Sequence, residues 1–165
     1  MQRVRWSVRP ADEDDVEALA RLWHEADELH ARISPGFFRR ADAERGRQRA
    51  ADALRDIGDG GHEVIFVAGD GAGEVRGACH LQIYDTPAGH TMVPERRGHV
   101  ETLIVARQFR RAGCGRALMQ AATEWARARG AGQLLLTVWA GNESAERFYA
   151  ALGYRTISQV LGTYL

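Results

Sequence analysis

Apolar residues recur along this chain with two different spacings, and each spacing predicts a different kind of element. Over residues 16–33 they step by three and four positions, which predicts a helix with one apolar face. The same spacing follows Gly113, and further helices are expected at about 41–57 and 142–152. The residues of the first apolar stripe are Val16, Leu19, Trp23, Ala26, His30 and Ile33.

Shorter apolar runs, rich in β-branched residues, predict strands between these helices. They cover residues 4–9, 63–68, 75–84, 99–106, 133–139 and 154–160. The glycine-rich segment 69–73 should close a hairpin, and the segment 85–98, with two prolines and two glycines, should be a loop. Because the early strands form a hairpin and the later ones alternate with helices, we expect one α/β domain over residues 1–165. Its central sheet should be mixed and mostly antiparallel, with helices on both faces.

The predicted strand at 99–106 leads through a glycine-containing turn directly into a helix. The first amides of a helix are unpaired and lie at the positive end of its dipole, and glycine lets a bulky anion approach the main chain. Between Pro94 and Leu118 there are six arginines and two acids, although the whole chain has 22 residues of each charge. This excess predicts an anionic ligand; a solvated, arginine-rich loop before an ordinary helix explains the same residues equally well.

Composition excludes several functional classes. The chain has no lysine, which rules out a P-loop, a kinase strand lysine and a lysine Schiff base. Leu118 stands where a dinucleotide-binding turn needs its third glycine. Two cysteines and six scattered histidines match no metal motif, so no metal is expected. Neutral net charge, the lack of a long apolar run and a charged segment 1–15 favour a cytoplasmic protein without nucleic-acid or membrane partners.

Four segments, in order and with consistent spacing, resemble the GNAT superfamily of N-acetyltransferases. The run Val100 to Val105 looks like the family's fourth strand, and Arg110-x-x-Gly113-x-Gly115 looks like its pyrophosphate loop. Asn142 looks like the asparagine that opens the next helix, and residues 148–154 look like the closing segment. The resemblance spans roughly residues 4–160.

The resemblance implies acetyl-CoA as co-substrate. Its pyrophosphate would lie on the amides of the loop, and its pantetheine arm would pair with the strand backbone like an added half-strand. Asn142 would contact the cofactor or simply cap its helix, and both interpretations remain open. The residues expected at the cofactor are Leu103, Ile104, Val105, Arg110, Arg111, Ala112, Gly113, Cys114, Gly115, Arg116, Asn142 and Tyr149.

Acetyl transfer to an amine needs a proton acceptor and a proton donor. Glu101 is the expected general base, with His99 on the same strand as the reserve; an ion pair with a loop arginine is the structural alternative for Glu101. Tyr149 stands where relatives place the general acid for the leaving thiolate, and packing in the core is its alternative. Cys114 at a helix start suggests a nucleophile, but direct transfer to the amine is favoured.

The acceptor is expected to bind near the first two helices and the loop 85–98, where relatives shape that site. An acidic run over residues 11–28 would steer a cationic amine, such as a polyamine, an aminoglycoside or a basic protein tail. A solvated helix face explains the same acids, and the aromatic residues are also typical of a core. The expected acceptor-site residues are Trp23, His30, Phe37, Phe38, Tyr84 and His99.

We therefore predict an acetyl-CoA-dependent N-acetyltransferase that acts directly on a primary amine, in a small molecule or a protein. The alternative is a catalytically degenerate relative that binds acetyl-CoA as a sensor or interaction protein. A nucleotide-binding regulator is weaker, because it would want a lysine or a third glycine. The resemblance leaves a homodimer open.

Overall fold

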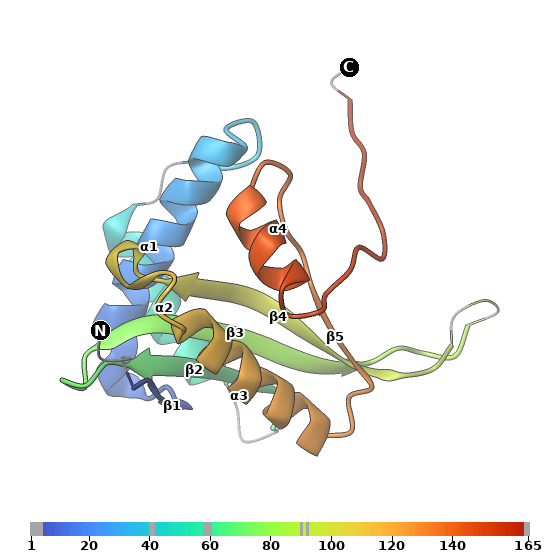
Figure 1. Cartoon of the computed structure of the whole chain (residues 1–165), viewed down its shortest axis with the longest axis horizontal. Helices are drawn as coiled ribbons and strands as arrows, with labels where there is room; N and C mark the ends of the chain where they lie inside the picture. The colour runs from blue at the N-terminus through green and yellow to red at the C-terminus, as the bar shows by residue number, and fades with distance from the viewer. Residues whose placement is uncertain (1–4, 40–41, 58–60, 90, 92, 164–165) are drawn as a thin grey trace.

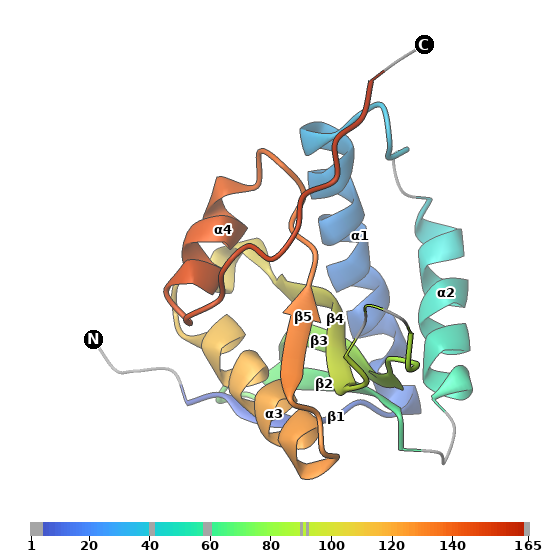
Figure 2. The ribbon, with the colours of Figure 1, turned by 90° about the vertical axis from the view of Figure 1, so that its right-hand side faces the viewer.

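The computed structural model of the chain describes residues 5–39, 42–57, 61–89, 91 and 93–163. Over these residues the backbone forms a five-stranded sheet in the order β1-β2-β3-β4-β5 (Figures 1 and 2). Strands β1 to β4 are antiparallel neighbours, whereas β5 runs parallel to β4. The strands are β1 (Ser7–Pro10), β2 (Glu63–Gly69), β3 (Val75–Asp85), β4 (Arg96–Val105) and β5 (Gln133–Leu136).

Helices cover both faces of this sheet. Helices α1 and α2 lie on one face, and α3 and α4 lie on the other (Figure 2). Two short 3-10 turns, Glu13–Asp15 and Arg107–Phe109, precede α1 and follow β4. The helices are α1 (Val16–Ile33), α2 (Ala43–Asp56), α3 (Cys114–Ala128) and α4 (Glu143–Ala150). The expected fold class, a mixed and mostly antiparallel sheet between helices, is confirmed.

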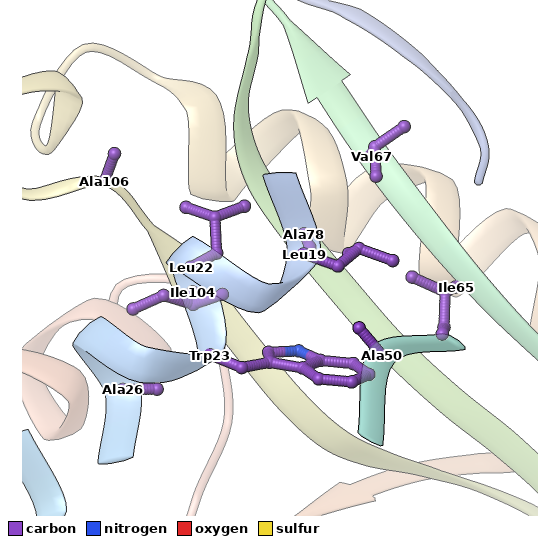
Figure 3. Packing of buried hydrophobic residues seen from close by; sticks show 10 residues of the cluster. All are labelled: Leu19, Leu22, Trp23, Ala26, Ala50, Ile65, Val67, Ala78, Ile104 and Ala106. Carbon is purple, nitrogen blue, oxygen red and sulfur yellow. The ribbon is translucent and has the colours of Figure 1, made fainter. Parts of the chain in front are cut away.

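A buried cluster lies on each face of the sheet because successive strand residues point to opposite sides. Under α1, Leu19, Leu22 and Trp23 pack against Ile65 and other strand residues (Figure 3). Under α3, a second cluster joins the helix to the other face of β2, β3 and β4. Residues 64–68 of β2 are all buried, as expected for a strand covered on both sides.

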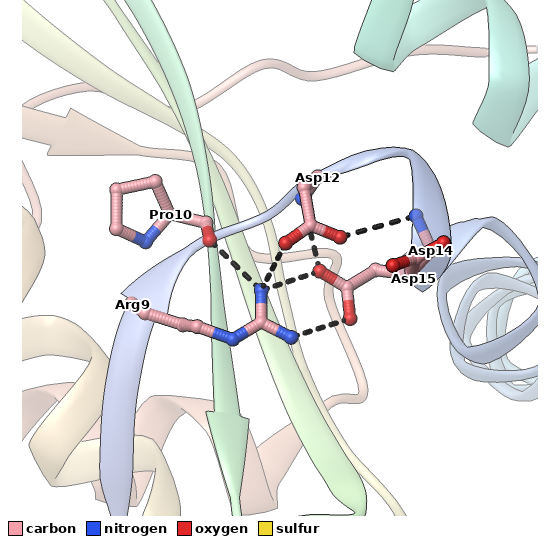
Figure 4. Close-up of polar contacts among 5 residues, drawn as sticks. All are labelled: Arg9, Pro10, Asp12, Asp14 and Asp15. Carbon is pink, nitrogen blue, oxygen red and sulfur yellow. Dashed lines mark hydrogen bonds and ion pairs between the residues drawn. The ribbon is translucent and has the colours of Figure 1, made fainter.

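The polypeptide enters α1 through a network of charged groups (Figure 4). The Arg9 guanidinium donates to both carboxylate oxygens of Asp15, over 2.7 and 2.9 Å. It also donates to Asp12, whose own side chain accepts from the Asp14 amide over 3.1 Å. Asp15 accepts a further bond from the Asp12 amide. These bonds fix the angle between edge strand β1 and the first helix.

A bulge interrupts the pairing of β3 with β4. His80 lies opposite Thr102, but Leu81 lies opposite Val100, so Glu101 is the extra residue of β4. On its other side, β4 pairs with β5 only from Arg97 to Val100. Beyond Val100 the β5 side of the strand therefore has no strand partner among the residues that the structure describes.

Most element predictions are confirmed, including the hairpin around 69–73. Four bounds were wrong. Pro10 is the last residue of β1 instead of its stop, which an edge strand tolerates. The loop 85–98 is shorter, because β3 reaches Asp85 and β4 begins at Arg96; β5 ends at Leu136 and not at residue 139.

The fourth correction concerns the predicted last strand. Residues 154–160 form no strand, and the segment extends away from the sheet (Figure 1). Its sequence has strand propensity, but no neighbouring backbone in the described structure supplies the hydrogen bonds that a strand requires. Residue 4 of the first predicted strand, residue 41 of the second predicted helix and residues 90 and 92 of the predicted loop lie outside the described residues.

Candidate functional site

The loop between β4 and α3 is held in an unusual backbone conformation. Arg111 has a φ of 62°, and Gly113, the N-cap of α3, has a φ of 91°. The positive φ at residue 113 explains why a glycine stands there, because other residues rarely adopt a left-handed backbone conformation. Two bonds fix the loop from outside: Trp6 Nε1 donates to the Ala112 carbonyl over 2.8 Å, and Arg110 Nε donates to the Val105 carbonyl over 2.9 Å.

The amides of this loop are free to bind a ligand. Within the described chain, none of the main-chain N–H groups of residues 111–116 donates a hydrogen bond, and the first bond of the helix runs from the Ala117 amide to Gly113. The positive end of the α3 dipole adds to their attraction for an anion. The exposed arginines 110, 111 and 116 surround this group. Together these amides form a candidate anion-binding turn.

The second glycine of the loop has a packing reason. A Cβ at Gly115 would come within 3.2 Å of the Phe148 ring carbon Cζ. Phe148 belongs to α4, so the absence of a side chain at Gly115 lets α4 approach the start of α3. The glycine pair thus serves two needs, a left-handed cap at Gly113 and close helix packing at Gly115.

The end of β4 beside this loop is open. Leu103, Ile104 and Val105 follow the point at which β5 stops pairing. The Val105 carbonyl already accepts the Arg110 guanidinium, so Arg110 ties the loop to the strand. An extended amide-containing ligand can pair with the remaining main-chain groups, because a strand edge offers both donors and acceptors.

Glu101, the bulged residue, is bound by two neighbours. Gln82 Nε2 donates to its Oε1 over 2.5 Å, and His99 Nδ1 lies 2.8 Å from the same oxygen. Burial raises the pKa of Glu101, but the bonds from Gln82 and His99 and the nearby imidazoles outweigh burial and lower the pKa below its ordinary value. The carboxylate is therefore ionised at neutral pH, and its Oε2 makes no hydrogen bond among the described residues.

The predicted ion pair of Glu101 with a loop arginine does not occur within the described structure; its partners are Gln82 and His99. Sequence reasoning missed Gln82. Its signal was the strand alternation, since Gln82 lies directly opposite His99 in the sheet. A second histidine, His80, pairs with Glu63 at 2.5 Å and lies beside the ring of Trp23. Polar groups thus line one face of the sheet around the bulge.

Tyr149 lies on the other side of the sheet, in the α3 cluster. Its ring contacts Phe148 at 5.2 Å and Tyr154 at 5.6 Å between centroids. Burial, with smaller effects of Cys79 and Tyr154, raises its pKa, so its hydroxyl remains protonated. That hydroxyl makes no hydrogen bond within the described chain, and no contact joins Tyr149 to Glu101. A ligand lying between β4 and α4 would have to connect the two residues.

Two other candidate residues have structural functions. Asn142 caps α4, because its side chain accepts a bond from the Ala145 amide over 3.3 Å. Cys114 is buried, and burial raises the pKa of its thiol to about 12. A thiol with this pKa is protonated at neutral pH and is a weak nucleophile.

The expected acceptor residues fall into separate groups. Trp23 is only 3% exposed and packs in the core, with the Arg49 guanidinium 5.0 Å above its ring. His30 stacks on Phe38 at 5.0 Å, and Trp139 contacts both Phe37 and Phe38. Sequence reasoning missed Trp139 as a neighbour of these rings because it was placed in the predicted strand 133–139, whereas β5 ends three residues earlier at Leu136.

Tyr84 and His99 lie elsewhere, on the sheet. Tyr84 is partly exposed near the end of β3, on the same side of that strand as Gln82. His99 contacts Glu101, as described above. Several acids of the segment 11–28 are paired with arginines: Asp12 and Asp15 with Arg9, Glu17 with Arg47, and Asp27 with Arg49. These ion pairs weaken the steering field that the sequence suggested.

Among the described residues, no group of three or more histidine, cysteine, aspartate or glutamate side chains is arranged to hold a metal ion. No described helix has both the length and the apolar character needed to cross a membrane.

Several solved structures share this fold. A mutant of the BH1408 protein from Bacillus halodurans superposes with a TM-score of 0.88 at 24% identity, covering 96% of this chain and 99% of that one. The aminoglycoside 6'-N-acetyltransferase AAC(6')-IG from Acinetobacter haemolyticus gives 0.71 at 15% identity, covering 96% and 97%. AAC(6')-Iy, bound to a CoA-acetylneamine bisubstrate analogue, gives 0.66 at 19% identity, covering 98% of both chains.

A comparison of the sequence with protein families identifies the family of this chain. No curated protein sequence matches the chain significantly. A family model described as the acetyltransferase (GNAT) family matches residues 21–154, which include the candidate anion-binding turn, β4 and α4. This chain therefore belongs to the GNAT acetyltransferase family.

Proposed function

We propose that this chain transfers an acetyl group from acetyl-CoA directly to a primary amine. The observation that carries the proposal is the row of free amides at residues 111–116, next to the open edge of β4. Acetyl-CoA supplies an acetyl group activated as a thioester, carried on a chain with a pyrophosphate and two amides. The turn fits the pyrophosphate, and the edge at Leu103–Val105 fits the amide-bearing arm.

The bulge at Glu101 supports its assignment as general base. A primary amine such as that of lysine has a pKa near ~10.4, so at pH 7 forming its neutral, nucleophilic state costs about 4.6 kcal/mol. Glu101 is ionised, and its Oε2 is open to bind the ammonium group and accept a proton, directly or through water. Gln82 and His99 hold the other oxygen and so orient the carboxylate.

Tyr149 is proposed as the general acid for the leaving thiolate. Its raised pKa keeps the proton on the hydroxyl until a strong base forms nearby, and a newly formed thiolate is such a base. Its ring is fixed by Phe148 and Tyr154, which places the hydroxyl reproducibly. This arrangement favours a single direct transfer over an acyl-enzyme on Cys114, whose thiol is buried and protonated.

The acceptor is proposed to lie near Phe38, whose ring contacts both His30 and Trp139. Aromatic faces attract cationic groups, which suits an ammonium-bearing substrate. Two relatives of the same fold carry aminoglycoside N-acetyltransferase names, so aminoglycosides belong in an acceptor screen with polyamines and basic peptides.

Replacing the proposed base tests this function most directly. In an assay of CoA release over the amine panel, Glu101→Gln should lower turnover by about a hundredfold at pH 7 without weakening acetyl-CoA binding. The difference should narrow as the pH approaches the amine's own pKa, where the substrate is already neutral. Glu124→Gln, on the exposed face of α3, is the control and should remain fully active.

Two outcomes would contradict the proposal. An acetyl-CoA-binding protein that turns over no amine in the panel, with the wild type and Glu101→Gln indistinguishable, would indicate a sensor or interaction protein. Stabilisation by ATP or NAD but not by CoA would instead indicate a nucleotide-binding regulator.

A further inference from the structure

Trp6 lies far from the candidate anion-binding turn in sequence but contacts it in the fold. Its indole Nε1 donates to the Ala112 carbonyl over 2.8 Å, across 106 positions of the chain. The residue stands directly before β1, whose pairing with β2 begins at Ser7. The family model matches residues 21–154, so Trp6 lies outside the stretch that the family pattern describes. That pattern therefore does not account for this contact.

The bond from Trp6 fixes the orientation of one peptide unit in the turn. A trans peptide is planar, and its carbonyl and its N–H point in opposite directions. Because the Ala112 carbonyl faces the indole of Trp6, the Gly113 N–H of the same peptide unit faces away from that indole. The Gly113 N–H is one of the free amides of the turn. Trp6 thus sets the direction in which one ligand-binding donor points.

The turn needs this support because its backbone is strained one residue earlier. Arg111, which is not a glycine, has a φ of 62°. A left-handed conformation is disfavoured for residues with a Cβ and persists only where surrounding contacts hold it. Within the described chain, the main-chain amides of residues 111–116 donate no bonds that could hold it. The bonds that do hold the turn come from two side chains, Trp6 and Arg110.

The ring of Trp6 is itself held by two side chains in series. It lies at right angles to the Phe109 ring, with the two centroids 6.2 Å apart. The Arg76 guanidinium lies 4.5 Å from the centroid of Phe109, and Arg76 pairs with Asp70 over 2.8 Å. The contacts therefore run from the β2–β3 hairpin through the second 3-10 turn to the indole. A donor held in this way keeps a fixed position against the turn.

We propose that Trp6 is a positioning residue for the pyrophosphate of acetyl-CoA. Its N–H keeps the turn in the anion-binding conformation before the cofactor arrives. Apparent affinity falls in proportion to the fraction of molecules whose site is competent, so loss of this bond weakens binding without removing any contact to the ligand. The inference rests on the proposed function in one respect, that acetyl-CoA places its pyrophosphate on this turn.

Trp6→Phe tests this role, because it keeps an aromatic ring beside Phe109 and removes the N–H donor. The Kd of acetyl-CoA, measured by calorimetry, should rise about fivefold, the typical effect of one neutral hydrogen bond. The Kd of acetyl-pantetheine, measured by competition with acetyl-CoA, should not change, because this thioester has no pyrophosphate. A merely structural role of Trp6 would not separate the two ligands.

Trp125→Phe is the matched control. Trp125 packs against the same buried cluster as Trp6, and its ring lies 4.1 Å from the Arg129 guanidinium, at the other end of α3. The substitution removes the same kind of indole at a distance from the turn. The Kd values of both ligands should equal those of the wild type.

A measurement on the wild type decides the question even if Trp6→Phe fails to fold. In protein with isotope-labelled tryptophan, exchange of the Trp6 indole proton with solvent reports the opening of its bond to Ala112. Saturating acetyl-CoA should slow this exchange at least about fivefold, because a ligand bound to the closed turn opposes its opening. Acetyl-pantetheine should not slow it.

Three results would overturn this inference alone. The first is a Kd of acetyl-CoA that is the same in Trp6→Phe as in the wild type. The second is an equal rise of Kd for both ligands, which would mean that Trp6 only stabilises the fold. The third is an indole proton whose exchange acetyl-CoA does not slow. A wild type that binds no acetyl-CoA would overturn the proposed function as well.

Discussion

The first three quarters of the molecule and its last quarter are packed differently. Up to Ala126 the described chain supplies every buried residue of the two clusters. From Arg127 to Thr163 no residue is buried, although this region contains β5, α4 and many apolar side chains. The two regions have similar hydrophobic patterns in sequence, so pattern alone does not separate them.

The difference teaches where this fold depends on something outside the chain. Strands β2 to β4 lie between α1 on one face and α3 on the other, and each is paired with strands on both sides over at least part of its length. In the last quarter, β5 and α4 lie beside the proposed cofactor site. The outer edge of β5 has no strand partner among the described residues. Acetyl-CoA is the partner that we propose for this region.

Leucine truncations measure the difference directly, and they carry the largest expected effect. Leu118 is fully buried in α3, so Leu118→Ala should cost about 3 kcal/mol in the free energy of unfolding, measured in urea. Leu136 in β5 is only partly buried, so Leu136→Ala should cost about 1 kcal/mol. Equal costs for the two truncations would mean that the last quarter is as tightly packed as the rest.

Acetyl-CoA should stabilise the folded protein by binding at the turn 111–116, which lies beside the end of β4. At a hundred times its Kd, a ligand that binds only the folded state adds about 2.7 kcal/mol, which is seen as a raised Tm. Gly113→Val should abolish this shift, because a side chain would block approach to the free amides.

The control for that variant is Gly130→Val, at the other end of α3. Gly130 has a φ of 80°, so valine there imposes a similar backbone strain far from the turn. Gly130→Val should lose stability but keep the shift with acetyl-CoA. A normal shift in Gly113→Val would exclude the turn as the binding site.

The charged network at the start of α1 should contribute a smaller, pH-dependent stability to the first region. Asp15 is 4% exposed; burial raises its pKa, but the bonds from Arg9 and the Asp12 amide outweigh burial and lower it. Asp15→Asn should cost about 2 kcal/mol at pH 7. Asp14→Asn, at an exposed neighbour, should cost much less.

The sign of the pH dependence follows from the lowered pKa. The unfolded chain binds the Asp15 proton near pH ~3.9, whereas the folded chain binds it only at lower pH. The contribution is therefore complete above the unfolded pKa and disappears as the pH falls through the folded pKa. The difference between wild type and Asp15→Asn in urea titrations should close in that acidic range, and a gap that persists there would show that the charge is not the cause.

Local patterns predicted the first region well because each pattern there is satisfied within the chain. The apolar stripe of α1, the hairpin at 69–73 and the glycine turn before α3 all depend on neighbours in sequence. The bulge at Glu101 was not predictable in this way, since it results from the register of two strands. Gln82 was missed for the same reason.

In the last quarter, the predicted strand at residues 154–160 was wrong for a different reason. Residues 154–160 have the composition of a strand, but a strand forms only beside another backbone. Within the described structure residues 154–160 pair with no other strand, so their propensity produces no strand.

The smallest predicted effect is a change in turnover when Tyr149, in the last quarter of the chain, is replaced. Tyr149→Phe removes only the hydroxyl and should lower turnover about tenfold, with the KM for acetyl-CoA unchanged, because the ring packing is retained. Tyr154→Phe is the matched control: its hydroxyl is also partly buried, with a raised pKa, but it is assigned no proton to transfer. Equal losses in the two variants, measured by CoA release, would mean that both tyrosines only pack α4 against the sheet. A loss of turnover confined to Tyr149→Phe would assign the proton donor to this loosely packed region. The proton acceptor, Glu101, would then come from the tightly packed β4.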